Sequence, residues 1–139
     1  MRSSPSRPVA PPRGGLPPPA ELRLPDGEVV WLRPVAEEVA RRLRAEFPDE
    51  AERYGDAGLE WCVHDNQHLV RWASLPPDSF DDQVAWLAAV LRARGYPLER
   101  LARDLELAAD VVREHWGERA APIADALRRG AGGIASDTS

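Results

Sequence analysis

A polar and aromatic segment near the middle of the chain contains the residues best suited to chemistry. It reads Leu59-Glu-Trp-Cys-Val-His-Asp-Asn-Gln-His-Leu-Val-Arg-Trp-Ala73. At about 100° per residue of an α-helix, one stripe is shared by Trp61, Asp65, His68 and Trp72, and this stripe is about three turns long, or roughly 16 Å. Tryptophan rings beside a carboxylate and an imidazole can stack on a flat molecule and hydrogen-bond to it. We therefore predict that these four residues bind a ligand or a partner helix.

Asn66 falls within the apolar arc of the same helix. That arc consists of Leu59, Cys62, Val63, Leu69, Val70 and Ala73. A buried amide left without partners costs roughly 1–3 kcal/mol, so Asn66 is expected to find hydrogen bonds in the interior. Two roles stay open for it: a structural amide that fixes the packing of this helix, or a supporting residue that orients a ligand.

His64 and His68 are four residues apart, which is the spacing of two metal ligands on one helix. The residues between them lack the glutamate of a zincin, and no third ligand is evident, so we predict no metal site. Ligation of a haem or a metal by His68 remains an alternative. The sequence also has no P-loop, glycine-rich dinucleotide motif or nucleophile elbow. We predict no catalytic residues, no cofactor and a non-enzymatic protein.

Prolines and glycines divide the chain into the elements that must position this segment. Pro25-Asp26-Gly27 is a turn signal between two apolar–polar runs and predicts a short β-hairpin over 22–32. Apolar spacings of three and four then predict helices over about 34–47, 56–74, 80–94, 97–116 and 118–129, with a short turn at 49–54. The fold class is all-α: a five- to six-helix bundle or a globin-like helical domain with a short N-terminal β-hairpin.

Both ends of the chain have compositions that oppose packing. Residues 1–20 contain seven of the 14 prolines, which predicts a disordered tail. This tail is either inert or a polyproline ligand for an SH3-like groove. A glycine-rich end predicts a second loose tail over 131–139. A single helical domain is expected over 21–130.

Composition narrows the classes of partner. The 139 residues have a net charge of −5 and a pI of about 5.2, which argues against a nucleic-acid partner. No apolar run reaches the roughly 18 residues of a membrane span, so no membrane partner is expected. Cys62 is the single cysteine, and the first residues lack the apolar core of a secretory signal. These features favour a cytoplasmic protein.

The stretch 84–112 has a recognisable arrangement of helix-capping and core residues. One helix ends at Arg94 and Gly95, and Pro97, Leu98 and Leu101 open the next helix. This pattern resembles a hairpin in the helical N-terminal sensor domains of bacterial regulators of the RsbR and PucR types. The resemblance covers about 30 of the 139 residues and implies a helical sensory domain.

Together these features predict a non-enzymatic regulatory, sensory or protein-interaction domain. Its expected partner is another protein or a second copy of itself in a homodimer. The alternative is a protein that binds a small molecule, a metal or haem through the segment that contains the tryptophans and histidines.

Overall fold

The computed structural model describes residues 17–138, and the chain enters the fold through a β-hairpin. Strands β1 (Glu21–Arg23) and β2 (Val29–Trp31) pair antiparallel, with Leu22 opposite Val30. The turn depends on Gly27, whose φ of 92° is a conformation that glycine adopts without strain. The hairpin expected over 22–32 is confirmed, and it lays Leu22 and Val30 against the core.

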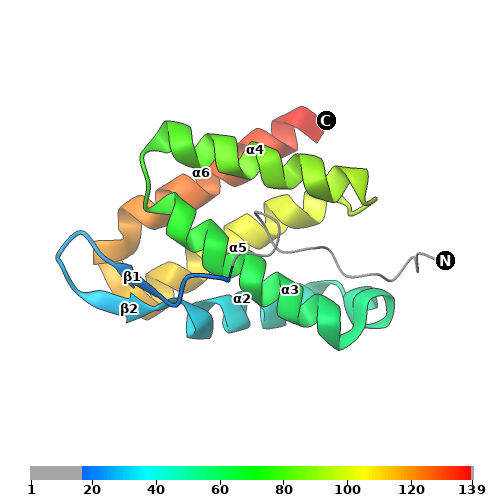
Figure 1. The fold of residues 1–139 in the computed structure, drawn as a ribbon, viewed down its shortest axis with the longest axis horizontal. Coiled ribbons are helices and arrows are strands. Elements are labelled where there is room, and N and C mark those ends of the chain that lie inside the picture. Colours follow the sequence, from blue (N-terminus) through cyan, green and yellow to red (C-terminus); the bar gives the residue numbers. More distant parts are fainter. Residues whose placement is uncertain (1–16, 139) are drawn as a thin grey trace.

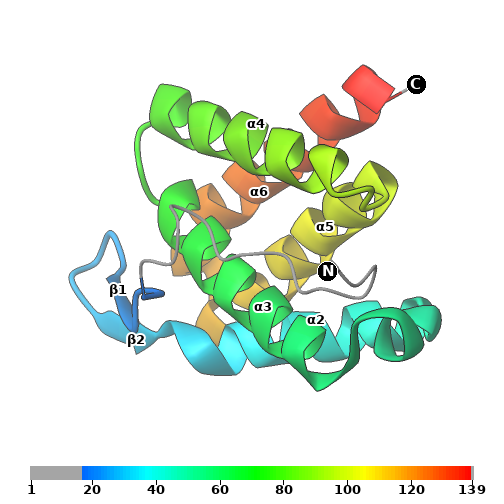
Figure 2. The ribbon, with the colours of Figure 1, turned by 45° about the vertical axis from the view of Figure 1, so that its right-hand side comes forward.

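Helices form most of the described chain, as expected. They are α2 (Leu32–Glu46), α3 (Asp49–Ala73), α4 (Pro77–Ala93), α5 (Leu98–Trp116) and α6 (Ala121–Thr138), with the short 3-10 helix η1 (Gly117–Ala120) before α6. Figures 1 and 2 show α3 crossing one face of the molecule diagonally, from the end of α2 to the start of α4. Helix α5 lies behind it and packs on both α2 and α6.

Helix α3 joins two segments that the sequence predicts to be separate. It includes both the turn expected at 49–54 and the helix expected over 56–74, with a kink at Gly55. Gly55 has φ 63° and ψ −161°, which side chains disfavour and glycine permits. Arg44 of α2 donates a 2.5 Å hydrogen bond to the Gly55 carbonyl at the kink. Arg44 therefore satisfies the Gly55 carbonyl, a backbone acceptor at the point where the helical conformation is interrupted.

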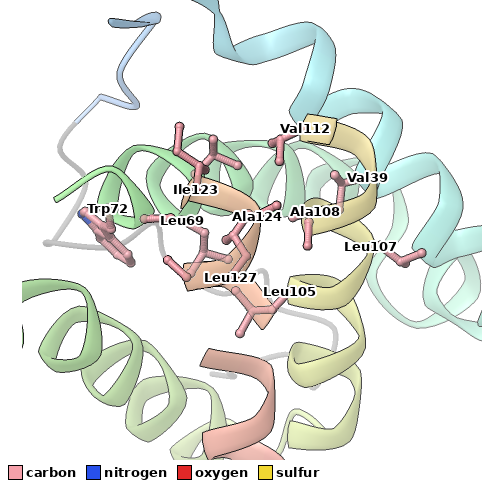
Figure 3. Close-up of a cluster of buried hydrophobic side chains, with 14 of the residues drawn as sticks. Val39, Leu69, Trp72, Leu105, Leu107, Ala108, Val112, Ile123, Ala124 and Leu127 are labelled. Carbon is pink, nitrogen blue, oxygen red and sulfur yellow. The ribbon is translucent and has the colours of Figure 1, made fainter. Parts of the chain in front are cut away.

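The hydrophobic core lies between α2, α3, α5 and α6 (Figure 3). Its members seen there include Val39, Leu69, Trp72, Leu105, Ala108, Val112, Ile123, Ala124 and Leu127. Leu69, Leu105 and Leu127 are completely buried, so they fix the distances between α3, α5 and α6. This packing holds the C-terminal half of α3 against the body of the protein.

The C-terminal segment differs from the loose tail expected over 131–139. Helix α6 continues to Thr138, and Ala131 and Ile134 are buried on its inner face. At Gly130 an added Cβ would lie 3.0 Å from the Phe80 ring, so glycine allows α6 to approach α4 closely. Glycines lower helix propensity, but burial of apolar side chains outweighs that local effect here.

The predicted N-terminal tail, 1–20, lies mostly outside the described residues. Residues 17–20 are described, and the Pro19 carbonyl accepts a 3.0 Å hydrogen bond from Gln67 of α3. The Ala20 carbonyl accepts a bond from the Leu32 backbone N–H, which links this segment to the start of α2. Among the helices of residues 17–138, none combines the length and apolarity needed to span a membrane.

Candidate functional site

A pocket lies where α3, from Glu50 to Asn66, meets α5. Its cavity volume is about 60 Å³, enough for a compact polar head group, and it opens to solvent. Most of its lining comes from α3, and α2, α4, α5 and the α4–α5 loop supply the rest. The lining residues are Leu43, Glu50, Tyr54, Gly58, Trp61, Cys62, Asp65, Asn66, Leu91, Tyr96, Leu101 and Asp104.

Asn66 and Asp104 form the inner polar contact of this pocket. Asn66 is completely buried and Asp104 is 5% exposed. The Asn66 amide donates a 2.9 Å hydrogen bond to Asp104 Oδ1 and a 3.0 Å bond to the Cys62 carbonyl. The expectation that Asn66 is buried is therefore confirmed, and its amide joins α3 to α5.

Four shielded polar atoms of the lining lack a hydrogen-bond partner among the described residues. They are the donor Trp61 Nε1 and the acceptors Asp65 Oδ1, Asn66 Oδ1 and Asp104 Oδ2. A buried polar group without a partner costs about 1–3 kcal/mol, and native interiors leave few of them. Four such atoms belong to residues of this one pocket, which makes it the strongest candidate for a binding site among residues 17–138.

The two aspartates of the pocket keep their protons to a higher pH than ordinary carboxyl groups do. Burial raises the pKa of Asp104 to about 7, and Glu50 raises it further while the Asn66 hydrogen bond lowers it. Burial, with a smaller contribution from the Asp104 charge, holds the pKa of Asp65 well above its usual range. Near neutral pH the pocket therefore contains carboxyl groups that can either donate or accept a proton.

Glu50 is a third carboxylate of the pocket, and its charge is compensated by an arginine. Its side chain is buried, and Arg100 donates a 2.7 Å hydrogen bond to Oε2 in an ion pair. The Tyr96 hydroxyl donates a 3.3 Å hydrogen bond to Oε1. Arg100 also bonds Asp49 at 3.0 Å and lies over the Phe47 ring. This network closes one end of the pocket and neutralises Glu50.

Cys62 lies beside the aspartates, with Sγ 3.9 Å from Asp104 Oδ1. Burial raises the pKa of the Cys62 thiol well above its usual range, and the nearby Asp104 charge adds to this effect. The thiolate is the nucleophilic form, so this cysteine is held in its unreactive state. Its contribution to the pocket is a small apolar surface with a weak hydrogen-bond donor.

The stripe predicted from the sequence is divided by the fold. Trp61 and Asp65 line the pocket. His68 and Trp72 do not: both are buried farther along α3, with ring centroids 5.6 Å apart, and Trp72 belongs to the hydrophobic core. The four side chains therefore do not form one continuous binding seam, because the second half of α3 is covered by neighbouring helices.

His64 lies outside the pocket lining and contacts residues of its own helix. Its Nε2 is 2.9 Å from a carboxylate oxygen of Glu60, and its ring meets Trp61 edge-on with centroids 5.6 Å apart. Over residues 17–138, no group of three or more His, Cys, Asp or Glu side chains is placed to hold a metal ion. A metal shared by His64 and His68 therefore lacks the further ligands it needs.

Comparison with known protein families, characterised proteins and solved structures found no match to this chain. The pocket between α3 and α5 is consequently the feature from which a function is inferred.

Several residues of the pocket could not be found from the polar segment alone. Asp104 is the most important of them, and Glu50 and Tyr96 are the others with polar contacts. One signal was present in the sequence: Asp104 stands between Leu101 and Leu105, which belong to the apolar stripe of its helix. A carboxylate on that buried face needs a specific partner, and Asn66 is that partner.

Proposed function

We propose that this protein is a small-molecule-binding domain whose ligand occupies the pocket between α3 and α5. The observation that supports this most directly is the set of four shielded polar atoms of the lining that lack partners among residues 17–138. They lie beside apolar and aromatic walls, which is the usual composition of a ligand site. A purely structural interface would pair or remove such groups, because each one lowers stability.

The division of α3 into two halves agrees with this proposal. Its C-terminal half contributes Leu69 and Trp72 to the hydrophobic core, where they support the fold. The part of α3 up to Asn66 contributes Trp61 and Asp65, which are only half-buried. The same helix thus has a rigid supporting end and an accessible end, an arrangement that keeps a binding site well ordered.

A fragment screen by NMR tests the proposal. The indole N–H of Trp61 is the reporter, and fragments that enter the pocket are expected to shift its resonance. Trp61→Ala should lower the affinity of such fragments, measured by titration calorimetry, at least tenfold, since it removes a wall and a hydrogen-bond donor together. Trp86→Ala is the matched control, because Trp86 lies on α4 outside the pocket lining and is 39% exposed.

Two results would contradict a ligand site at this position. One is a chemically diverse screen in which no fragment shifts the Trp61 indole resonance. The other is a set of fragments whose affinity falls equally in Trp61→Ala and in Trp86→Ala.

A regulatory domain that pairs with a second copy of itself is the other proposal. Trp86 and Val90 of α4 supply its support, since Trp86 is 39% exposed and Val90 is half-buried while Val84, Leu87 and Leu91 face the core. An exposed tryptophan is a common anchor of protein interfaces. Sedimentation at tens of micromolar tests this: a dimeric mass that Trp86→Ala converts to a monomeric mass is expected, and a monomeric wild type would exclude it.

A further inference from the structure

We infer that the ligand of the α3–α5 pocket is a small organic cation with several N–H donors, such as an amidinium, guanidinium or primary ammonium group. This inference rests on the proposed function and names the chemical class that the pocket selects.

With Asp65 and Asp104 ionised, the unpaired hydrogen-bonding groups of the pocket are mostly acceptors. Three of the four atoms without a partner in the described chain are acceptors: Asp65 Oδ1, Asn66 Oδ1 and Asp104 Oδ2. Asn66 and Asp104 are at least nine-tenths buried, so water satisfies them poorly. A head group with two or more N–H donors on a small centre can bond several acceptors at once. A ligand that only accepts hydrogen bonds would require both aspartates to keep their protons and would still leave the Asn66 oxygen unpaired.

The charges around the two aspartates point to the same class of ligand. Glu50 is neutralised by Arg100, whereas no ion pair within residues 17–138 involves Asp65 or Asp104. Arg44 of α2, whose charge acts on Cys62, has its guanidinium bonded to the Gly55 carbonyl and forms no ion pair with either aspartate. The remaining titratable neighbours, Cys62 and Tyr96, are uncharged when protonated. A bound cation would supply the charge that the protein itself does not supply.

Aromatic rings form part of the wall around these acceptors. Tyr54, Trp61 and Tyr96 all line the pocket, and the Tyr54 and Tyr96 rings lie 5.8 Å apart. The face of such a ring attracts a cation through its quadrupole, most strongly for tryptophan. Leu43, Leu91 and Leu101 complete an apolar wall suited to the hydrocarbon part of the ligand. An organic cation matches both the polar base and these walls, and a bare metal ion matches only the base.

Probes that differ only in the head group test this inference with the full-length chain. Benzamidine is the cation, benzamide its neutral counterpart and benzoate its anionic counterpart. Phenethylamine and phenethyl alcohol form a second pair with an ammonium head. Titration calorimetry and the Trp61 indole resonance measure binding. Each cation is expected to bind at least tenfold more tightly than its neutral counterpart, and benzoate is expected not to bind.

Asp65→Asn and Asp104→Asn test the acceptors. Each is expected to weaken benzamidine at least tenfold and to leave benzamide within threefold. Asp110→Asn is the matched control, because Asp110 is on α5 with Asp104 but pairs with Arg128 outside the pocket. If Asp104→Asn does not fold, Asp65→Asn at the half-buried rim keeps the test valid. A folded Asp65→Asn that binds benzamidine as tightly as wild type would overturn the inference.

The pH dependence gives an independent readout. Benzamidine stays charged between pH 5.5 and 8, so a change in its affinity reports protein groups. Because the cation favours ionised aspartates, affinity should rise with pH and approach a tenfold change per pH unit below the pKa of Asp104. The affinity of a neutral fragment should not rise in this way. An affinity for benzamidine that is flat or falls over this range would contradict the inference.

The outcomes separate this inference from the function on which it rests. If neutral or anionic fragments shift Trp61 and the two cations bind no better than their counterparts, the cation preference is wrong and a small-molecule site remains. If no fragment of any charge shifts Trp61, both are wrong.

Discussion

Asn66 of α3 and Asp104 of α5 are joined by a 2.9 Å hydrogen bond that uses only half of each side chain. The Asn66 nitrogen donates to Oδ1 of Asp104, while the Asn66 oxygen and Oδ2 of Asp104 have no partner in the part of the chain that is described. The paired half fixes α3 against α5. Both residues also line the pocket, so this packing contact adjoins the proposed binding site.

Removing the Asn66 amide should destabilise the protein. Asn66→Ala is expected to lower the free energy of unfolding by about 1–3 kcal/mol, because Asp104 Oδ1 loses its buried donor. Urea unfolding followed by circular dichroism measures the change. In a double-mutant cycle with Asp104→Ala, the double variant should lose less stability than the sum of the two single variants.

Gln67→Ala is the control for this cycle. Gln67 is also buried on α3, but its amide bonds the Pro19 carbonyl and does not contact Asp104. Its effect should add to that of Asp104→Ala. An additive result for Asn66 and Asp104 would mean that the hydrogen bond between them contributes no coupling energy.

Ionisation of Asp104 should make stability fall as the pH rises. Its pKa is about 7 in the folded chain, against an ordinary value of 3.8. Between these values the unfolded chain has released the proton and the folded chain still holds it. Stability from this group is therefore complete below about pH 4 and is lost progressively up to about pH 7, by as much as about 1.4 kcal/mol per pH unit.

The difference between wild type and Asp104→Asn isolates this effect. Surface carboxylates such as Glu38, whose pKa is lowered by hydrogen bonds from Arg41 and Arg42, are the same in both proteins and cancel. Asp104→Asn should gain in melting temperature relative to wild type as the pH rises from 4 to 7. Asp110→Asn should show no such trend. A constant difference across this range would mean that Asp104 titrates normally.

The elements of this fold were predictable because prolines and glycines mark their ends. Gly27 marks the turn of the hairpin, and Pro48, Gly95 and Gly117 lie at or next to helix ends. The burial of Asn66 was predictable too, since a 100° helical period places it among apolar neighbours. Local sequence therefore contains most helix ends and the inner face of α3, although Gly55 marks a kink within α3 and not its start.

The limits of the site were not predictable from one helix. The helical period places Trp61 and Trp72 on the same side, but it does not say which neighbours cover each of them. Helices distant in sequence bury Trp72 in the core, and the α4–α5 loop brings Tyr96 to the other half of α3. The role of Asp104 likewise depends on a contact over 38 residues of sequence.

His68 is now expected to matter for stability more than for binding, in contrast to its predicted place in the binding stripe. It is 6% exposed, contacts the Trp72 ring and does not line the pocket. His68→Ala should lower the free energy of unfolding by about 1–3 kcal/mol and leave benzamidine affinity within threefold. His115→Ala, at an exposed position of α5, should change stability by less than about 0.5 kcal/mol. A binding loss without a stability loss would restore His68 to the site.

Two glycines of α6 test whether this helix packs as the structure shows. An added Cβ at Gly133 meets nothing within 4 Å, so Gly133→Ala should stabilise the helix by about 0.5–1 kcal/mol. At Gly130 the same methyl would lie 3.0 Å from the ring of Phe80, which is completely buried and has little room to move. Overpacking of this kind typically costs about 1–3 kcal/mol, which exceeds the gain in helix propensity. Gly130→Ala should therefore destabilise the protein while Gly133→Ala stabilises it, as measured by urea unfolding. If the segment after residue 130 were loose, as its composition predicts, Gly133→Ala would leave stability unchanged.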